Sequence, residues 1–293
     1  MKKLVIVIPT FNRCHLLRKT LTQLVQQASE FNDIDTSIVV VNDGCTDETA
    51  SMVSKEFAQV VQITTRGNLW YTKSINVGFA EALNLKADLV LTLNDDIELK
   101  TDYLRQLTNA AAKYSEPTII GSTSLTYDKP HRVTFSGVKK IDWWRFKQTN
   151  YHGYLEQIRE GSISGERESV LLPGRGMLID ARILKKIGFF EPKLVQYASD
   201  DEFCYRATSS GYKVYVSWDA IIYSHHELTG AGAVHLKPTF LKFLNGFFNP
   251  YTKNYWKKHC FIIWNYGIKP LFPLTITMVL LGEFYSFLKY KFK

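Results

Sequence analysis

The segment Asp88-Leu-Val-Leu-Thr-Leu-Asn-Asp-Asp-Ile-Glu98 decides the fold, because an apolar run ends abruptly in polar side chains. Residues 89–93 are typical of a buried strand, and Asn94, Asp95 and Asp96 follow at its carboxyl end. In open α/β sheets, ligands bind at this edge. Two adjacent carboxylates repel each other, so we expect a cation beside them, and oxygen ligands suit Mg²⁺ or Mn²⁺. A solvated turn before a helix is the alternative.

Strand and helix patterns alternate through the first hundred residues. Apolar runs predict strands at residues 4–8, 37–41 and 59–63. Apolar residues at helical spacing predict helices at residues 16–25, 52–57 and 72–85. This alternation is typical of an α/β fold with a parallel sheet and helices on both faces. Because no GxGxxG follows the first strand, a dinucleotide site of the Rossmann type lacks support.

The composition is that of a globular protein. The 293 residues are 45% hydrophobic and 22% charged, which suits one large domain or one domain with an appendage. The formal net charge is +8, and residues 251–293 hold +6 of it, through seven lysines against the single acid Glu283. Because only +2 remains for the first 250 residues, we do not expect a nucleic acid partner.

Cysteine usage and the N-terminus bear on the compartment. Cys14, Cys45, Cys204 and Cys260 are far apart and form no CxxC pair, which argues against a zinc site or a disulfide framework. The basic and apolar N-terminus is short and lacks a small-residue cleavage site, so we interpret it as a strand and not as a signal peptide. We therefore expect a cytoplasmic protein.

Four segments occur in the order that a known enzyme family shows: VIPTFNR (7–13), VVNDGCTDET (40–49), RGNLWYTKSINVGFAEAL (66–83) and LTLNDDIEL (91–99). Together they resemble family 2 glycosyltransferases of the GT-A fold, most closely the bacterial branch of rhamnosyl- and galactofuranosyltransferases. The resemblance implies a Rossmann-like mixed sheet, mostly parallel, with helices on both faces. It also implies a transferase for hexosyl or deoxyhexosyl groups.

The resemblance implies which residues bind the donor nucleotide. Asp43 matches the acid that accepts a hydrogen bond from N3–H of uracil or thymine, a position where cytosine offers no donor. A UDP- or dTDP-sugar is therefore the expected donor. Trp70 could equally be a core side chain, since large aromatics fill cores more often than they line sites. The residues implied are Pro9, Thr10, Asn12, Arg13, Asp43, Arg66, Asn68, Trp70, Asn94 and Asp95.

The same resemblance implies a divalent metal, Mn²⁺ or Mg²⁺. Asp96 matches the last acid of the DxD-type motif, while Asn94 replaces the first Asp of many members. His225 and His226 follow a strand-like run where the family often has a histidine ligand, and we expect at least one of them to bind the metal.

Two later segments resemble the catalytic half of the family. The first, VLLPGRGMLIDARILKKIGFFEP (170–192), contains a bend beside the donor sugar and its diphosphate, with Gly174, Arg175 and Gly176. The second contains Ser199-Asp200-Asp201-Glu202-Phe203, where the family has Glu-Asp-x-Asp-Leu. Asp200 matches the general base, and Asp201 is the nearby rival. Either acid could instead be a helix cap. An inverting displacement at the anomeric carbon is implied.

The last part of the chain differs from the rest. We expect a GT-A domain over residues 1–234, with a nucleotide-binding half (1–115) and an acceptor and catalytic half (116–234), and a helical extension over 235–293. The extension is basic and aromatic, which favours association with the inner face of the cell membrane, near a glycan or polyprenyl-linked acceptor of cell-surface polysaccharide synthesis. Packing on the catalytic domain, or on a second copy in a homo-oligomer, is the alternative.

Two competing functions remain at this stage. A nucleotidyltransferase would also use a metal and a base-binding sheet edge, but it needs a glycine-rich triphosphate loop, and residues 9–13 contain no glycine. A non-catalytic nucleotide-sugar-binding subunit is the other, because Asn94 and Ser199 depart from the family pattern.

Overall fold

The computed structural model describes residues 1–31, 33–159, 161–224 and 239–291. Its described residues form a mixed ten-stranded sheet with the path β10-β12-β6-β11-β4-β1-β2-β3, with β5 paired to β12 and β7 paired to β6. The strands are β1 (Lys2–Thr10), β2 (Ile34–Asn42), β3 (Val61–Thr64), β4 (Leu89–Thr92), β5 (Ile97–Leu99), β6 (Thr118–Thr126), β7 (Val133–Phe135), β10 (Glu166–Glu168), β11 (Met177–Asp180) and β12 (Lys213–Ser224). A separate hairpin contains β8 (Val138–Asp142) and β9 (Lys147–Asn150).

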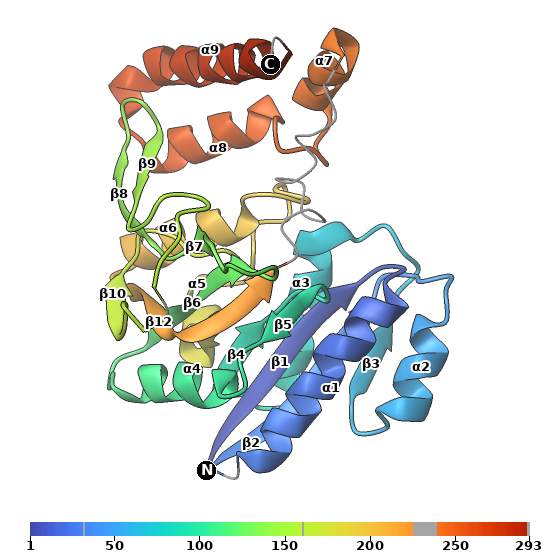
Figure 1. The fold of residues 1–293 in the computed structure, drawn as a ribbon. Coiled ribbons are helices and arrows are strands. Elements are labelled where there is room, and N and C mark those ends of the chain that lie inside the picture. Colours follow the sequence, from blue (N-terminus) through green and yellow to red (C-terminus); the bar gives the residue numbers. More distant parts are fainter. Residues whose placement is uncertain (32, 160, 225–238, 292–293) are drawn as a thin grey trace.

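Helices cover both faces of the sheet (Figure 1). They are α1 (Cys14–Glu30), α2 (Thr49–Glu56), α3 (Trp70–Asn84), α4 (Tyr103–Ala112), α5 (Ala181–Ile187) and α6 (Ser199–Ser209). Alternate residues of β1 point to opposite faces: Leu4 and Ile6 belong to the core that α1, α2 and α4 cover, and Val5 and Val7 to the core under α3, α5 and α6. The predicted α/β architecture is therefore confirmed.

The sheet is parallel where the sequence predicted it. Strand β1 pairs in parallel with β2 and β4, and β2 pairs in parallel with β3. Strand β11 then lies antiparallel between β4 and β6, and β12 is parallel to β6. As a result, the carboxyl ends of β1, β2 and β4 meet at one edge of the sheet, which is the edge where the polar motifs were expected.

Some elements are harder to recognise in the sequence. The runs at 212–216 and 220–223 form one strand, β12, whose pairing with β6 shifts between Ser217 and Ile221. Such a shift adds residues to one strand without ending it, so the sequence pattern looked interrupted. The irregular stretch 128–168 contains β7 to β10. These strands are short, and β9 is fully exposed, so they lack the apolar signal of a core strand.

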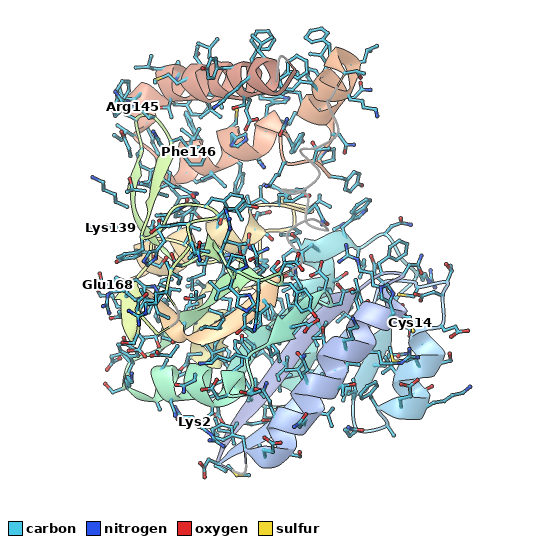
Figure 2. All side chains as sticks on the ribbon, viewed as in Figure 1. Lys2, Cys14, Lys139, Arg145, Phe146 and Glu168 are labelled. Carbon is cyan, nitrogen blue, oxygen red and sulfur yellow. The ribbon has the colours of Figure 1, made fainter. Side chains whose placement is uncertain are left out.

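The extension contains α7 (Phe240–Phe248), α8 (Trp256–Tyr266), the short helix η2 (Lys269–Leu271) and α9 (Phe272–Lys291). These helices form a layer beyond α6 and the β8–β9 hairpin (Figure 1). Figure 2 shows Arg145 and Phe146 at the hairpin tip beside this layer, and the Phe146 ring lies 6.0 Å from the His259 ring. By length and composition, residues 269–289 could cross a membrane, which by itself is weak evidence.

Candidate active site

A cleft of about 780 Å³ lies at the carboxyl ends of β1, β2 and β4. Twelve of the predicted site residues line it: Pro9, Thr10, Arg13, Asp43, Asn68, Trp70, Asn94, Asp95, Asp96, Gly174, Arg175 and Asp200. Side chains from sequence positions almost two hundred residues apart therefore converge on one cleft, as the motifs predicted.

Four described site residues lie outside the lining. Asn12 is adjacent, and its side-chain oxygen accepts a hydrogen bond from the backbone N of Thr46 at 2.8 Å. Arg66 and Asp201 do not line the cleft either. Gly176 has a structural role, because a Cβ there would lie 2.5 Å from the Ser122 hydroxyl. The predicted ligands His225 and His226 lie outside the described residues.

The acidic pair after β4 is neutralised from within the protein. Asp95 and Asp96 are both buried, and the Arg13 guanidinium donates to them at 3.1 and 2.8 Å. The Thr10 hydroxyl donates to Asp95 at 2.8 Å. Burial nevertheless raises the pKa of Asp95 to about 6, although the charge of Arg13 opposes the shift. The cation expected beside the two carboxylates is thus, in this structure, an arginine.

The donor set at this edge also fits a metal of the Mg²⁺ or Mn²⁺ kind. Asn94, Asp95 and Asp96 offer oxygen ligands, and all three line the cleft. Among the described residues no group of three His, Cys, Asp or Glu side chains gathers as a complete metal cage. Ions of this kind usually take one or two carboxylates and complete their shell with water and substrate phosphates. Asp96 would be the carboxylate ligand, with Arg13 displaced from it.

Replacing Arg13 by Met should lower the free energy of unfolding by about 2 kcal/mol in EDTA, because two buried carboxylates lose their charged donor. The loss should be smaller at pH 5 than at pH 8, since Asp95 takes up a proton near pH 6. Adding Mn²⁺ at pH 8 should restore part of the stability. Urea unfolding followed by circular dichroism measures these changes.

Arg18→Met is the matched control, since it breaks the exposed pair with Glu56 and should change stability little. If Arg13→Met in EDTA unfolds at the same urea concentration as wild type, the arginine does not neutralise the acidic pair.

Asp43 holds the loop that precedes α3. Its carboxylate accepts hydrogen bonds from the Thr65 hydroxyl at 2.8 Å, from the backbone N of Leu69 at 2.9 Å and from the backbone N of Trp70 at 3.0 Å. Asn68 and Trp70 have backbone φ angles of 65° and 59°, which residues other than glycine rarely adopt. The backbone N of Leu69 also lies 3.1 Å from the second carboxylate oxygen, so three protein donors make four contacts with this group. Since a carboxylate has about four acceptor sites, an N–H at the cleft would take the place that Leu69 shares between the two oxygens.

The start of α6 presents Asp200 to the cleft. The Asp200 carboxylate accepts hydrogen bonds from the backbone N of Gly174 at 2.7 Å and of Asp201 at 3.0 Å. Burial raises the pKa of Asp200, and it raises the pKa of Asp201 to about 8. Backbone donors favour the ionised form of Asp200, whereas Asp201 has Asp200 as a repelling neighbour. Asp200 is therefore the carboxylate of the two that the site favours as the proton acceptor.

Gly174 has to be a glycine because of its neighbour Tyr71. A Cβ at Gly174 would lie 1.7 Å from the Tyr71 hydroxyl oxygen. That hydroxyl is buried at the cleft without a hydrogen-bond partner in the described structure, and burial, with the charge of Asp200, raises its pKa. Arg175 is similar, because its Nε is buried and unpartnered, and burial lowers its pKa. These polar groups are available to a bound molecule.

Other lining residues were not predicted from the sequence. The missed ones are Phe11, Tyr71, Ser74, Thr134, Tyr154, Pro173, Gln196, Tyr197, Ala198, Ser224 and Lys253. Tyr154 ends the stretch 143–154, which is rich in aromatic residues. Because aromatic faces suit sugar rings, that richness could have indicated a side chain at the cleft. Gln196 and Tyr197 directly precede the acidic run. Lys253 comes from the extension, and a single sequence gives no reason to bring it to the cleft.

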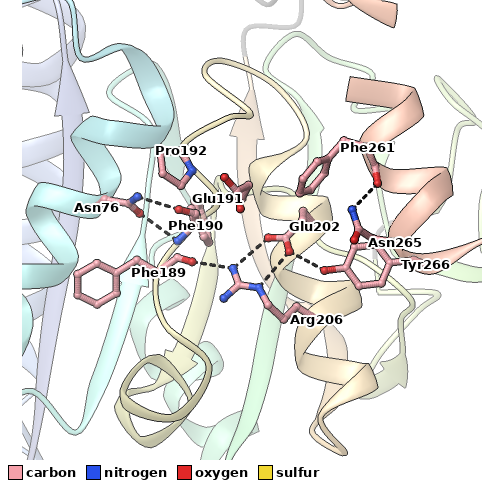
Figure 3. Close-up of a pocket in the computed structure, with 10 residues that line it drawn as sticks. All are labelled: Asn76, Phe189, Phe190, Glu191, Pro192, Glu202, Arg206, Phe261, Asn265 and Tyr266. Carbon is pink, nitrogen blue, oxygen red and sulfur yellow. Dashed lines mark hydrogen bonds and ion pairs between the residues drawn. The ribbon is translucent and has the colours of Figure 1, made fainter. Parts of the chain in front are cut away.

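A second cavity, of about 490 Å³, lies between α6 and α8 (Figure 3). Glu202 on α6 accepts a hydrogen bond from the Tyr266 hydroxyl at 2.6 Å and pairs with Arg206 at 2.9 Å. Arg206 also donates to the backbone carbonyls of Ile187 and Phe189. Because these groups satisfy one another, we interpret this cavity as a structural joint that docks α8 onto α6.

Comparisons with known proteins agree with this geometry. The sequence pattern of the family described as "Glycosyltransferase like family 2" matches residues 2–238. Undecaprenyl-phosphate 4-deoxy-4-formamido-L-arabinose transferase from Enterobacter sp. (strain 638) is 24% identical over 188 residues, which are 62% of this chain and 51% of that protein. The chain thus spans about half of the length of this curated relative.

Solved structures show the same fold. The crystal structure of S. aureus TarS superposes with a TM-score of 0.54 at 18% identity, over 84% of this chain and 40% of that one. The crystal structure of GalNAc-T7 with UDP, GalNAc and Mn²⁺ gives a TM-score of 0.60 at 13% identity, over 76% of this chain and 43% of that one. At these identities the likeness concerns the fold alone.

Proposed function

Because the chain belongs to the glycosyltransferase-like family 2, we propose that it is an inverting, metal-dependent transferase that uses a UDP- or dTDP-sugar. The observation that carries the proposal is one cleft in which the acidic pair Asp95–Asp96 and the carboxylate of Asp200 line common space. A donor diphosphate at the acidic pair and an acceptor hydroxyl at Asp200 could therefore meet within this cleft. We assign the donor nucleotide to the β1 and β2 edge and the acceptor hydroxyl to Asp200.

The chemistry follows from these positions. Asp200 accepts the proton of the acceptor hydroxyl as its oxygen forms a bond to the anomeric carbon, while the bond from that carbon to the nucleoside diphosphate breaks. A carboxylate is a weak base for a free alcohol, but the hydroxyl becomes acidic as the new bond forms. The half-buried Arg175 lies where it can neutralise charge on the departing diphosphate. A bound Mg²⁺ or Mn²⁺ at Asp96 would supply further charge stabilisation.

We propose a glycan or polyprenyl-linked acceptor and a role in cell-surface polysaccharide synthesis. The name of the Enterobacter relative, an undecaprenyl-phosphate transferase, supports a lipid-linked acceptor. Membership of the bacterial rhamnosyl- and galactofuranosyltransferase branch remains a proposal that rests on the sequence resemblance. We also propose residues 1–234 as the catalytic domain and 235–293 as an extension that holds the enzyme at the inner face of the membrane.

Exposed apolar residues support this membrane role. On α7 and α9 they are Phe240, Leu241, Leu244, Phe248, Leu274, Leu281, Phe284 and Tyr285. We call these residues the apolar surface of the extension. Lysines that surround an apolar surface favour anionic lipid headgroups. The alternative, packing on the catalytic domain, applies to α8, whose Ile262 and Ile263 are buried. Helix α9 contacts the β8–β9 hairpin as well, since the Thr275 hydroxyl donates to the backbone carbonyl of Trp144 at 3.0 Å.

Donor binding tests the proposal first. We expect one UDP- or dTDP-sugar to bind in the presence of Mn²⁺ or Mg²⁺, to bind at least about tenfold more weakly with chelator, and to be hydrolysed slowly without acceptor. Asp96→Ala should weaken binding in the same way as chelator. Calorimetry measures binding, and chromatography of released nucleotide measures hydrolysis.

If no nucleotide sugar binds under any metal condition, the proposed function is wrong. A non-catalytic nucleotide-sugar-binding subunit is the second candidate, because Ser199 replaces the family's leading Glu and is fully buried against the Thr72 hydroxyl at 2.8 Å. Donor binding without hydrolysis or transfer, and unaffected by Asp200→Asn, would favour that candidate.

A further inference from the structure

Lys253 brings the extension into the catalytic cleft. It lies in the segment between α7 and α8, outside the region that matches the family pattern. Even so, it lines the same cleft as Arg175 and Asp200. Within the described residues, the other groups that line this cleft all come from positions 9–224. The extension therefore contributes a cation to the active site itself.

Contacts on both sides of Lys253 fix its position. The Tyr251 ring stacks on the Trp70 ring with a centroid distance of 4.1 Å and an interplanar angle of 23°. On the other side, the Lys258 ammonium donates to the backbone carbonyl of Lys253 and lies 5.5 Å from the ring centroid of Tyr197. Trp70 and Tyr197 both line the cleft. The segment is thus anchored to two cleft walls, with Lys253 between its anchors.

Lys253 and Arg175 bring two positive charges to the same cleft. Lys253 is an exposed residue, but loss of water around its ammonium and the charge of Arg175 lower its pKa, while Glu283 favours its charged form. Asp96 and Asp200 favour the charge of Arg175, but burial lowers its pKa overall. Within the described residues, neither cation makes an ion pair. Two such cations at one cleft favour an anionic ligand.

The position of Lys253 indicates which anion it meets. The segment that carries it joins α7 to the α8–α9 pair, and α7 and α9 carry the apolar surface of the extension. A lipid-linked acceptor has its phosphate at the junction between the apolar chain and the sugar that reacts. An acceptor whose chain follows the apolar surface and whose hydroxyl reaches Asp200 would have its phosphate near Lys253.

We propose that Lys253 binds the phosphate that joins lipid and sugar in the acceptor, while Arg175 beside it serves the donor diphosphate. This inference rests on the proposed function, because it requires a lipid-linked acceptor. Lys253 is then a binding residue that the extension adds to the catalytic domain. It gives the extension a part in acceptor selection in addition to its proposed part at the membrane.

Calorimetry on the full chain with farnesyl phosphate as the probe tests this inference. We expect Lys253→Ala to weaken farnesyl phosphate binding about tenfold, which corresponds to about 1.4 kcal/mol, and Lys253→Arg to retain most of the binding. Binding of the uncharged alcohol farnesol should not change. Lys257→Ala is the matched control, because Lys257 is exposed, has its ammonium beside the Trp256 ring and does not line the cleft.

Titration of each variant with UDP separates acceptor phosphate from donor diphosphate. We expect UDP affinity to be equal in wild type and Lys253→Ala. If UDP affinity falls as much as farnesyl phosphate affinity, Lys253 serves the donor, and the inference is wrong. It is also wrong if Lys253→Ala and Lys257→Ala weaken the binding of farnesyl phosphate equally, or if neither variant weakens it. Failure of every nucleotide sugar to bind wild type would instead overturn the proposed function, while the farnesyl phosphate result would stand by itself.

Discussion

Replacing Asp200 by Asn is expected to lower the rate of sugar transfer by about 10²–10⁴-fold and to leave donor affinity unchanged. The reason is that an asparagine side chain would keep the size of the aspartate but could not accept the proton of the acceptor hydroxyl. The amide would also lose one of the two acceptor oxygens that now meet the backbone N of Gly174 and of Asp201. Transfer or donor hydrolysis under saturating donor measures the rate, and calorimetry measures the affinity.

Asp201→Asn is the matched control for this prediction. Asp201 is half-buried beside Asp200 but does not line the cleft, so its amide variant should retain activity. Because burial raises the pKa of Asp201 to about 8, its carboxyl is mostly uncharged below that pH, so the amide variant should leave the rise of rate with pH unchanged. If Asp201→Asn loses as much rate as Asp200→Asn, the base assignment is wrong.

The free energy of unfolding should also depend on pH through Asp201. Burial raises the pKa of Asp201 from its ordinary value of 3.8 to about 8, so the folded protein holds that proton more tightly than the unfolded chain does. The free energy of unfolding should therefore fall as pH rises from about 4 to 8. Asp201→Asn should flatten this dependence, which urea unfolding at several pH values would show.

Local sequence patterns predicted the central strands of the sheet and the edge at which the cleft lies. The apolar runs became β1, β2 and β4, because fully buried parallel strands need near-continuous apolar residues. Because these strands are parallel, the polar groups that follow them meet at one edge of the sheet. Asp43 and Asp95 follow β2 and β4 and line a single cleft, and Asp200 joins them from the start of α6, more than one hundred residues further along the chain.

Long-range contacts account for most of what the sequence left out. Arg13 was predicted beside the donor, and its bond to Asp96 depends on how the loop after β1 approaches the loop after β4. Lys253 lines the cleft and Tyr251 stacks on Trp70, and both precede α8, which docks on α6 through Tyr266 and Glu202. Such contacts join parts of the chain that share no local pattern, so hydrophobic periodicity cannot predict them.

Replacing Asp43 by Asn is expected to lower the affinity for UDP by about 10–100-fold. The carboxylate that supports the loop, and that we propose to accept from the base, would become an amide. One oxygen would become an NH₂ group that faces the backbone N–H of Leu69 or Trp70. The left-handed conformation of Trp70 would then lose its support, at a cost of about 1–3 kcal/mol in the free energy of unfolding. Calorimetry and urea unfolding measure the two effects.

The ratio of UDP to CDP affinity distinguishes base recognition from loop support. An ionised carboxylate accepts from N3–H of uracil, whereas N3 of cytosine is itself an acceptor, so wild type should prefer UDP. In Asp43→Asn the amide can donate to cytosine, and the ratio should fall toward one. Thr65→Val removes a loop hydrogen bond of 2.8 Å and keeps the carboxylate, so it should weaken both nucleotides equally. If Asp43→Asn also keeps the ratio of wild type, Asp43 supports the loop and does not read the base.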